Sequence, residues 1–157
     1  MKARKRQTLR GVWLLGALAL LAGCSSIPLK EREQAERARV EAYAGQPIDH
    51  FTWLGRYDGW KPLGPQEALV WTTPSRAYLI KVQQPCEDLR FATHIGLTST
   101  LHTVYSRGLD YVKVRGWRCP IEEIRPVDYG RLQADLRKER QTRQAQAAAT
   151  ENRDETG

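Results

Sequence analysis

The stretch that decides the fold reads ALVWTTPSRAYLIKV and covers residues 68–82. Two apolar runs, residues 68–72 and 77–82, flank the turn residues Thr73-Pro74-Ser75. Each run has the length of a β-strand and is rich in β-branched and aromatic residues, which strands favour. The stretch therefore predicts a β-hairpin.

The residues around this hairpin, 48–128, predict one small β domain. Turn signals such as Leu63-Gly64-Pro65 and Arg115-Gly116 fall among them at short intervals, as in antiparallel sheets. The predicted fold class is therefore mainly β, α+β overall, with one small antiparallel domain. Further strands are expected over residues 91–98, 100–106 and 111–115, and short helical turns at 66–67 and 87–88. Because Ile121 and Ile124 are three apart, residues 119–127 form either a bulged strand or a single helical turn.

Residues 24–47 precede this domain and predict a helical stalk. They include KEREQAERARVEAYAG, residues 30–45, a run of good helix formers that ends at a glycine. Glu33 and Arg37 are spaced for a stabilising pair one helical turn apart. The apolar stripe is thin, essentially Val40, Tyr43 and alanines, which favours a solvated spacer over a partner-binding helix.

Residues 129–157 predict a polar helix and tail. Tyr129, Leu132 and Leu136 could lay one or two helical turns on the domain. Residues 137–157 contain no Leu, Ile, Val, Met or aromatic residue. Such a stretch cannot bury a face, so it is expected to be a frayed helix or disordered.

Residues 1–23 have the pattern of an export signal. Five basic residues lie in the first ten positions, and GVWLLGALALLA follows over residues 11–22. A bilayer-spanning helix needs about 20 apolar residues, whereas the apolar region of a signal peptide has about 7–15. The segment is therefore expected to be removed as a signal peptide.

The signal closes with Leu21-Ala22-Gly23-Cys24, which resembles the bacterial lipobox. The resemblance implies that Cys24 is acylated and becomes the mature N-terminus, with membrane lipid as its partner. Two or more acyl chains give a stable anchor. By the same resemblance, Ser25 favours the inner leaflet of the outer membrane, facing the periplasm, over the inner membrane.

The charge of the chain belongs largely to this signal. The whole sequence has 25 basic and 18 acidic residues, a net charge of +7. Removal of residues 1–23 takes away five of the basic residues and none of the acidic ones, which leaves 20 against 18, or +2. This balance lacks the electrostatic footprint of a nucleic-acid-binding protein.

The three cysteines divide into one lipid anchor and one pair. With Cys24 acylated, Cys86 and Cys119 remain in an oxidising compartment and predict a disulfide. The alternative is a redox pair, but the CxxC spacing typical of such pairs is missing.

Two stretches carry a family resemblance: RFATHIGLTS, residues 90–99, and LDYVKVRGWRCPIEEIRPVD, residues 109–128. They are similar to a family of small Gram-negative envelope lipoproteins classed as a domain of unknown function. Cys86 also fits that pattern. The resemblance covers residues 50–130 and the lipobox, and it implies no activity, substrate or catalytic residue.

The chemistry of known active sites is mostly missing from the sequence. No Gly-x-Ser-x-Gly turn exists. A triad can be drawn from His94 or His102 with Ser99 and Asp110, but such proximity is common by chance. His94 and His102 could also bind a metal with His50, although zinc sites need three or four ligands at recognisable spacings. No catalytic residue, metal site, cofactor or small-molecule ligand is predicted.

Interaction is the remaining function. Trp53, Trp60 and Trp117 belong to a domain too small to enclose all its aromatic side chains, and exposed aromatics are typical of binding surfaces. The first hypothesis is a non-enzymatic binding or structural accessory with an envelope protein as partner. The alternative is a small hydrolase or metal-dependent enzyme that uses His94 and His102. A third hypothesis is strand addition at an exposed sheet edge.

Overall fold

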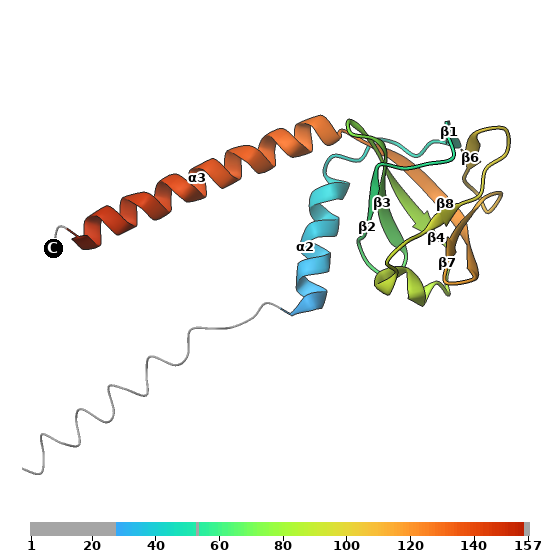
Figure 1. Ribbon diagram of the computed structural model, residues 1–157, viewed down its shortest axis with the longest axis horizontal. Coiled ribbons are helices and arrows are strands. Elements are labelled where there is room, and N and C mark those ends of the chain that lie inside the picture. The colour runs from blue at the N-terminus through green and yellow to red at the C-terminus, as the bar shows by residue number, and fades with distance from the viewer. Residues whose placement is uncertain (1–27, 53, 156–157) are drawn as a thin grey trace, which may run out of the picture. The chain divides into compact units, whose positions relative to one another are not determined.

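The computed structural model describes residues 28–52 and 54–155 (Figure 1). The chain divides into two units, residues 1–32 and 33–157, and the strands lie in the second. The predicted signal peptide, Cys24 and Trp53 lie outside the described residues. The elements are, in chain order, α2 (Leu29–Glu41), β1 (His50–Thr52), β2 (Gly59–Pro62), β3 (Glu67–Thr73), β4 (Arg76–Val82), the 3-10 helix η2 (Glu87–Phe91), β5 (Gly96–Leu97), β6 (Thr103–Tyr105), β7 (Tyr111–Val114), β8 (Trp117–Val127) and α3 (Tyr129–Glu155).

The strands confirm the predicted class, a mainly β, α+β fold with one small antiparallel domain. Six strands form one sheet in the order β2-β3-β4-β8-β7-β5, and β1 pairs with β6 in a second sheet. All named strand pairs are antiparallel. The predicted hairpin is β3–β4, in which Ala68 pairs with Ile80 and Trp71 with Ala77.

The edge of the main sheet at β2 is short and blunted. The strand has four residues, with Lys61 exposed and Pro62 at its end. Lysine and proline on a short edge strand oppose pairing with another chain. This edge therefore does not favour the hypothesis of strand addition, which calls for a long, uncharged edge.

The strand β8 resolves the alternatives left open for residues 119–127. It is a continuous strand whose first part pairs with β7 and whose second part pairs with β4. Lys81 pairs with Glu123 and Val82 with Ile121, so Glu122 is an extra residue in the ladder. This bulge explains why Ile121 and Ile124, at three-residue spacing, point into one core.

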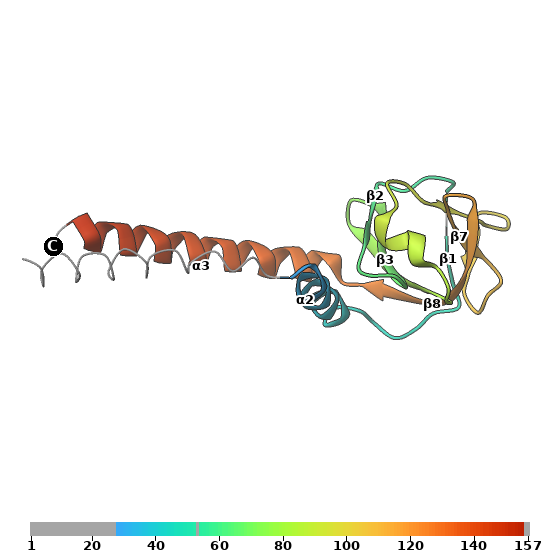
Figure 2. The same cartoon turned by 90° about the horizontal axis from the view of Figure 1, so that it is seen from below.

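The sheet has a core on each face, because alternate residues of its central strands are buried on opposite sides. On β4, Ile80 and Val82 belong to the first core, whereas Ala77 and Leu79 belong to the second. Figure 1 shows η2, in yellow-green, at one end of the strands, and Figure 2, which views the molecule from that side, shows the strands around it. Its Leu89 is fully buried in the first core.

The segment 33–47 differs from the solvated spacer expected from the sequence, because Val40, Tyr43 and Ala44 pack on the domain. Val40 is buried in the second core, together with Leu63 and Leu132. The expected pair of Glu33 with Arg37 does not form; instead, both carboxylate oxygens of Glu33 accept hydrogen bonds from Arg90. These bonds lower the pKa of the Glu33 carboxyl below its usual value.

The helix α3 begins as predicted and extends further than expected. Leu132 is buried in the second core, and Tyr129 and Leu136 pack against it. The helix continues to Glu155, with every described side chain from Arg137 to Arg153 exposed. The stretch expected to be frayed or disordered is thus a solvated helix.

The region between η2 and β7 has less strand than predicted. The expected strands over residues 91–98 and 100–106 are reduced to β5 and β6, which have two and three residues. The helical turn expected at residues 87–88 is η2, whereas Glu67 begins a strand. In the described part of the chain, no helix is long and apolar enough to cross a membrane.

Candidate functional site

The residues of the possible triad do not assemble into one. Asp110 is buried, and its carboxylate accepts hydrogen bonds from Thr98 Oγ1 at 2.6 Å and from the Tyr105 N–H at 2.9 Å. Thr98 Oγ1 in turn accepts a hydrogen bond from the Tyr111 N–H at 2.8 Å. The Asp110 carboxylate is therefore engaged in joining β5, β6 and β7, and Ser99 is exposed.

The three histidines lie at separate places in the fold. His94 is exposed and its Nδ1 contacts Thr93 Oγ1 at 3.3 Å. His102 is exposed in the turn before β6, with a φ of 60°. The His50 ring packs against Tyr105 with centroids 5.4 Å apart. Among residues 28–52 and 54–155, no three His, Cys, Asp or Glu side chains are grouped so that they could hold a metal ion.

The tryptophans separate into packed and exposed ones. Trp60 on β2 is half-buried and packs against the first core. Trp117, at the start of β8, is 67% exposed. Trp117 is thus the aromatic side chain among the three candidates that is free to meet a partner, while Trp53 lies outside the described residues.

A tight turn holds Trp117 in place. Val114 pairs with Trp117 across the β7–β8 hairpin, so only Arg115 and Gly116 form the loop. Both have positive φ, 45° and 88°, the geometry of a type I′ turn, which matches the twist of the strands that it joins. The indole is therefore presented from a rigid hairpin.

Beside Trp117 lies a pocket of about 220 Å³ whose lining is mostly apolar. Its lining residues are Pro85, Cys86, Asp88, Trp117 and Cys119. Cys86 and Cys119 are buried and joined by the predicted disulfide, which forms the floor, whereas Trp117 stands at the rim. The disulfide thus connects the start of η2 to β8 and brings the lining together.

Arg115 links this pocket to η2. Its Nη1 lies 3.9 Å from Asp88 Oδ1, and its Nη2 donates a hydrogen bond of 3.4 Å to the Phe91 carbonyl. The Phe91 side chain is exposed. Asp88 and Trp117 thus line the pocket with the disulfide, and Arg115 connects Asp88 to the Phe91 backbone beside it. We call the pocket with its lining residues Asp88 and Trp117, together with Arg115 and Phe91, the Trp117 surface.

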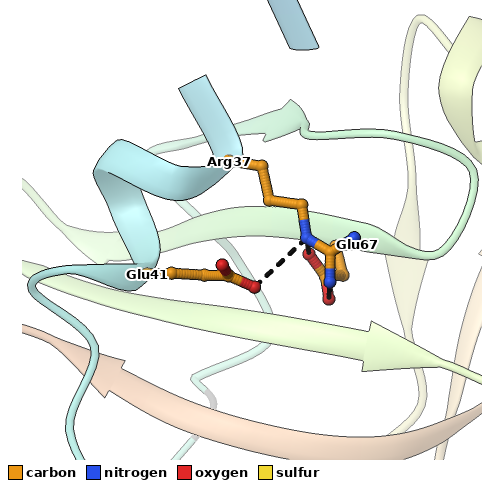
Figure 3. Close-up of polar contacts among 3 residues, drawn as sticks. All are labelled: Arg37, Glu41 and Glu67. Atoms are coloured by element: carbon orange, nitrogen blue, oxygen red, sulfur yellow. Dashed lines mark hydrogen bonds and ion pairs between the residues drawn. The ribbon is translucent and has the colours of Figure 1, made fainter. Parts of the chain in front are cut away.

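A second polar cluster joins α2 to the sheet (Figure 3). Arg37 Nη2 donates a hydrogen bond of 2.8 Å to Glu67 Oε1, and its Nε donates one of 3.1 Å to Glu41 Oε1. The Nε also lies 2.7 Å from Glu67 Oε2, as an ion pair without an aligned hydrogen bond.

Burial dominates the electrostatics of this cluster. Glu67 is only 5% exposed. Loss of water raises the pKa of its carboxyl above the usual value, and the Arg37 charge offsets part of that rise. A shifted pKa marks candidate catalytic groups. The Glu67 carboxylate, however, is buried and hydrogen-bonded to Arg37 of α2. Its geometry fits a role in holding the helix.

Comparison with known protein families gives a match. Residues 5–150 match the model of a family of unknown function, DUF6491. The chain belongs to the DUF6491 family. No curated protein and no solved structure matches it. The expected resemblance to a family classed as a domain of unknown function is confirmed. The matched residues include Cys24, both disulfide cysteines and Trp117.

Membership of DUF6491, a family of unknown function, assigns no role to any residue. Sequence reasoning found Trp117 and the disulfide but missed Pro85, Asp88 and Arg115 as parts of one surface. The Arg115-Gly116 turn signal and the position of Pro85 beside Cys86 were visible. Their meeting depends on contacts between segments that the disulfide joins across a sequence separation of 33 residues, which no local pattern reports.

Proposed function

We propose that this DUF6491 protein is a lipid-anchored bacterial envelope protein that faces the periplasm and acts as a non-enzymatic binding or structural accessory. Acylated Cys24 attaches it to the inner leaflet of the outer membrane. The Trp117 surface makes its contact with a partner protein.

The proposal of an anchor is supported by the order of features in the sequence. A basic cluster, an apolar run of signal-peptide length and Leu-Ala-Gly-Cys follow one another up to Cys24. The remaining two cysteines are used by the disulfide, which is the state expected in an oxidising compartment.

The observation that carries the proposal of binding is the position of Trp117. A tryptophan that is 67% exposed on a rigid hairpin, beside an apolar pocket, leaves a large apolar area in water. Tryptophan and arginine are enriched among the residues that dominate binding energy at protein interfaces. Trp117 and Arg115 offer both at one place.

The anchor is tested by labelling the full chain, expressed in a Gram-negative bacterium, with a palmitate analogue. Wild-type protein is expected to take up the label and to fractionate with the outer membrane. Cys24→Ser should lose the label, while Cys86→Ser with Cys119→Ser should keep it. Label retained by Cys24→Ser, or wild-type protein found in the soluble fraction, overturns the anchor.

The binding role is tested by cross-linking in intact cells, followed by mass spectrometry. One dominant envelope partner is expected, and Trp117→Ala should abolish its recovery. Leu101→Ala is the matched control, because Leu101 is an exposed apolar side chain that does not line the pocket. A partner recovered equally well with Trp117→Ala, or no partner at all, overturns this role for the Trp117 surface.

A further inference from the structure

The size of the pocket beside Trp117 restricts what it can hold. Pockets for drug-sized ligands and cofactors have volumes of about 300–1,000 Å³. At about 220 Å³ the present pocket is below that range. It suits one inserted side chain of a partner better than a whole small molecule.

The lining residues determine which kind of partner side chain fits the pocket. The disulfide, Pro85 and the Trp117 indole give apolar walls, and Asp88 contributes the only ionisable side chain of the lining described. An apolar stem with a cationic end fits both parts. The face of an indole attracts a cation, and a carboxylate beside it adds a charge-assisted hydrogen bond.

Arg115 does not saturate Asp88. The distance from its Nη1 to Asp88 Oδ1 is 3.9 Å, beyond hydrogen-bond range, and the two side chains are 54% and 40% exposed. Exposed ion pairs of this kind contribute little. An incoming cation at hydrogen-bond distance can therefore displace the weaker contact, and Arg115 retains its hydrogen bond to the Phe91 carbonyl.

Among cationic side chains, arginine matches the site best. Its guanidinium is planar, stacks on aromatic faces, and pairs with a carboxylate through two parallel hydrogen bonds. Lysine offers a compact, strongly hydrated charge that makes less of the indole face.

We propose that the pocket between Trp117 and Asp88 takes an arginine side chain of the partner protein, stacked on the indole and hydrogen-bonded to the carboxylate. This inference rests on the proposed binding role and adds the chemistry of the partner. It requires that the partner present an arginine on a protruding segment.

The test uses the full chain in detergent micelles, uniformly labelled with ¹⁵N, titrated with three blocked peptides. Acetyl-Gly-Arg-Gly-amide is expected to shift the Trp117 indole resonance in a saturable manner, which Trp117→Phe assigns. The citrulline peptide has the same shape without the charge and should bind about fivefold more weakly. The glutamate peptide should leave the resonance unchanged.

Variants locate the binding. Asp88→Asn should weaken binding of the arginine peptide about fivefold, and Trp117→Ala about tenfold, measured at the Cys119 amide. The matched control is Asp58→Asn, which neutralises a carboxylate in another pocket beside another tryptophan, Trp71, and should leave the affinity unchanged.

Each contrary outcome overturns the inference in a different way. Equal affinity for arginine and citrulline peptides removes the role of charge, and binding of the glutamate peptide assigns the surface to Arg115 and an acidic partner. Both outcomes leave the Trp117 binding role standing. Absence of any shift with all three peptides removes the pocket as a side-chain site, whereas the cross-linking result with Trp117→Ala decides the binding role separately.

Discussion

Arg37 on α2 donates a hydrogen bond of 2.8 Å to Glu67 on β3, thirty residues later in the chain. The donor is 47% exposed at its side chain, whereas the acceptor is almost completely buried. The two residues therefore differ in what their removal leaves behind. Loss of Glu67 leaves a cation in contact with water, but loss of Arg37 leaves a carboxylate in the protein interior.

This asymmetry predicts unequal effects of the two substitutions. Arg37→Met should lower the free energy of unfolding by about 1–3 kcal/mol, because the buried charge loses its partner. Glu67→Gln should lower it by less than about 1 kcal/mol, because the neutral amide keeps the shape and Arg37 remains solvated and bonded to Glu41. Urea unfolding of the full chain at neutral pH measures both. Equal losses, or a larger loss for Glu67→Gln, would contradict the assignment.

The raised pKa of Glu67 predicts a pH dependence of the same pair. A carboxyl whose pKa is higher in the folded state binds its proton more tightly there, so its contribution to stability is present below the unfolded pKa. That contribution is lost as pH rises through the folded pKa. The ordinary pKa of a glutamate carboxyl is 4.5. The loss of this contribution to stability therefore begins near that pH and continues as the pH rises toward neutral. Unfolding at pH 4.5 and 7 should show Glu67→Gln gaining stability relative to wild type as pH rises; a relative loss would refute the direction.

The difference between expected and observed α2 shows where sequence reasoning ends. The hairpin of β3 and β4 is specified locally, by two apolar runs and the turn residues between them, so it could be predicted. The packing of α2 is not local: Val40 is its only buried residue, and its ion pairs reach Arg90, which is 57 residues from Glu33 in the chain. A helix with so weak an apolar pattern is indistinguishable from a solvated one until its partners are known.

The candidate site was predictable in its chemistry but not in its assembly. The pairing of Cys86 with Cys119 followed from counting cysteines, and Trp117 followed from the small size of the core. Whether Trp60 or Trp117 stays exposed depends on the register of β2 with β3 and on the turn at Arg115-Gly116. The spacing of Ile121 and Ile124 fitted both a bulge and a helical turn, and pairing with β4 decided between them.

We expect the disulfide between Cys86 and Cys119 to contribute a large share of the stability of the domain. The bond spans a sequence separation of 33 residues, for which loss of chain entropy in the unfolded state gives about 4 kcal/mol. Cys86→Ser with Cys119→Ser should lower the free energy of unfolding by up to this amount, measured in urea. Cys24→Ser is the control, since it retains the bond. An unchanged unfolding midpoint in the double variant would show that the disulfide does not support the fold.

We expect substitution of Asp110 to lower the stability of the domain. The sequence had suggested the same residue as a member of a possible catalytic triad. Its buried carboxylate accepts from Thr98 Oγ1 and from the Tyr105 N–H. Asp110→Asn replaces one accepting oxygen by a donor and should cost about 1–3 kcal/mol. Asp58→Asn, on an exposed carboxylate, should change stability by less than about 0.5 kcal/mol. Equal stability of the two variants in urea unfolding would contradict the role of Asp110 in joining the strands.

The helix α3 has a part that packs on the domain and a part that is solvated. We expect the two parts to contribute very differently to stability. Leu132 is buried in the second core with Val40 and Leu63, whereas the described side chains from Arg137 onward are exposed. Leu132→Ala should therefore cost about 2–5 kcal/mol through lost burial and the cavity left behind. Removal of residues 138–157 takes away exposed ion pairs, such as that of Arg39 with Glu139 at 3.7 Å, which contribute less than about 1 kcal/mol. Unfolding followed by tryptophan fluorescence should give the truncated chain a midpoint close to wild type. A midpoint as low as that of Leu132→Ala would show that the distal helix stabilises the domain.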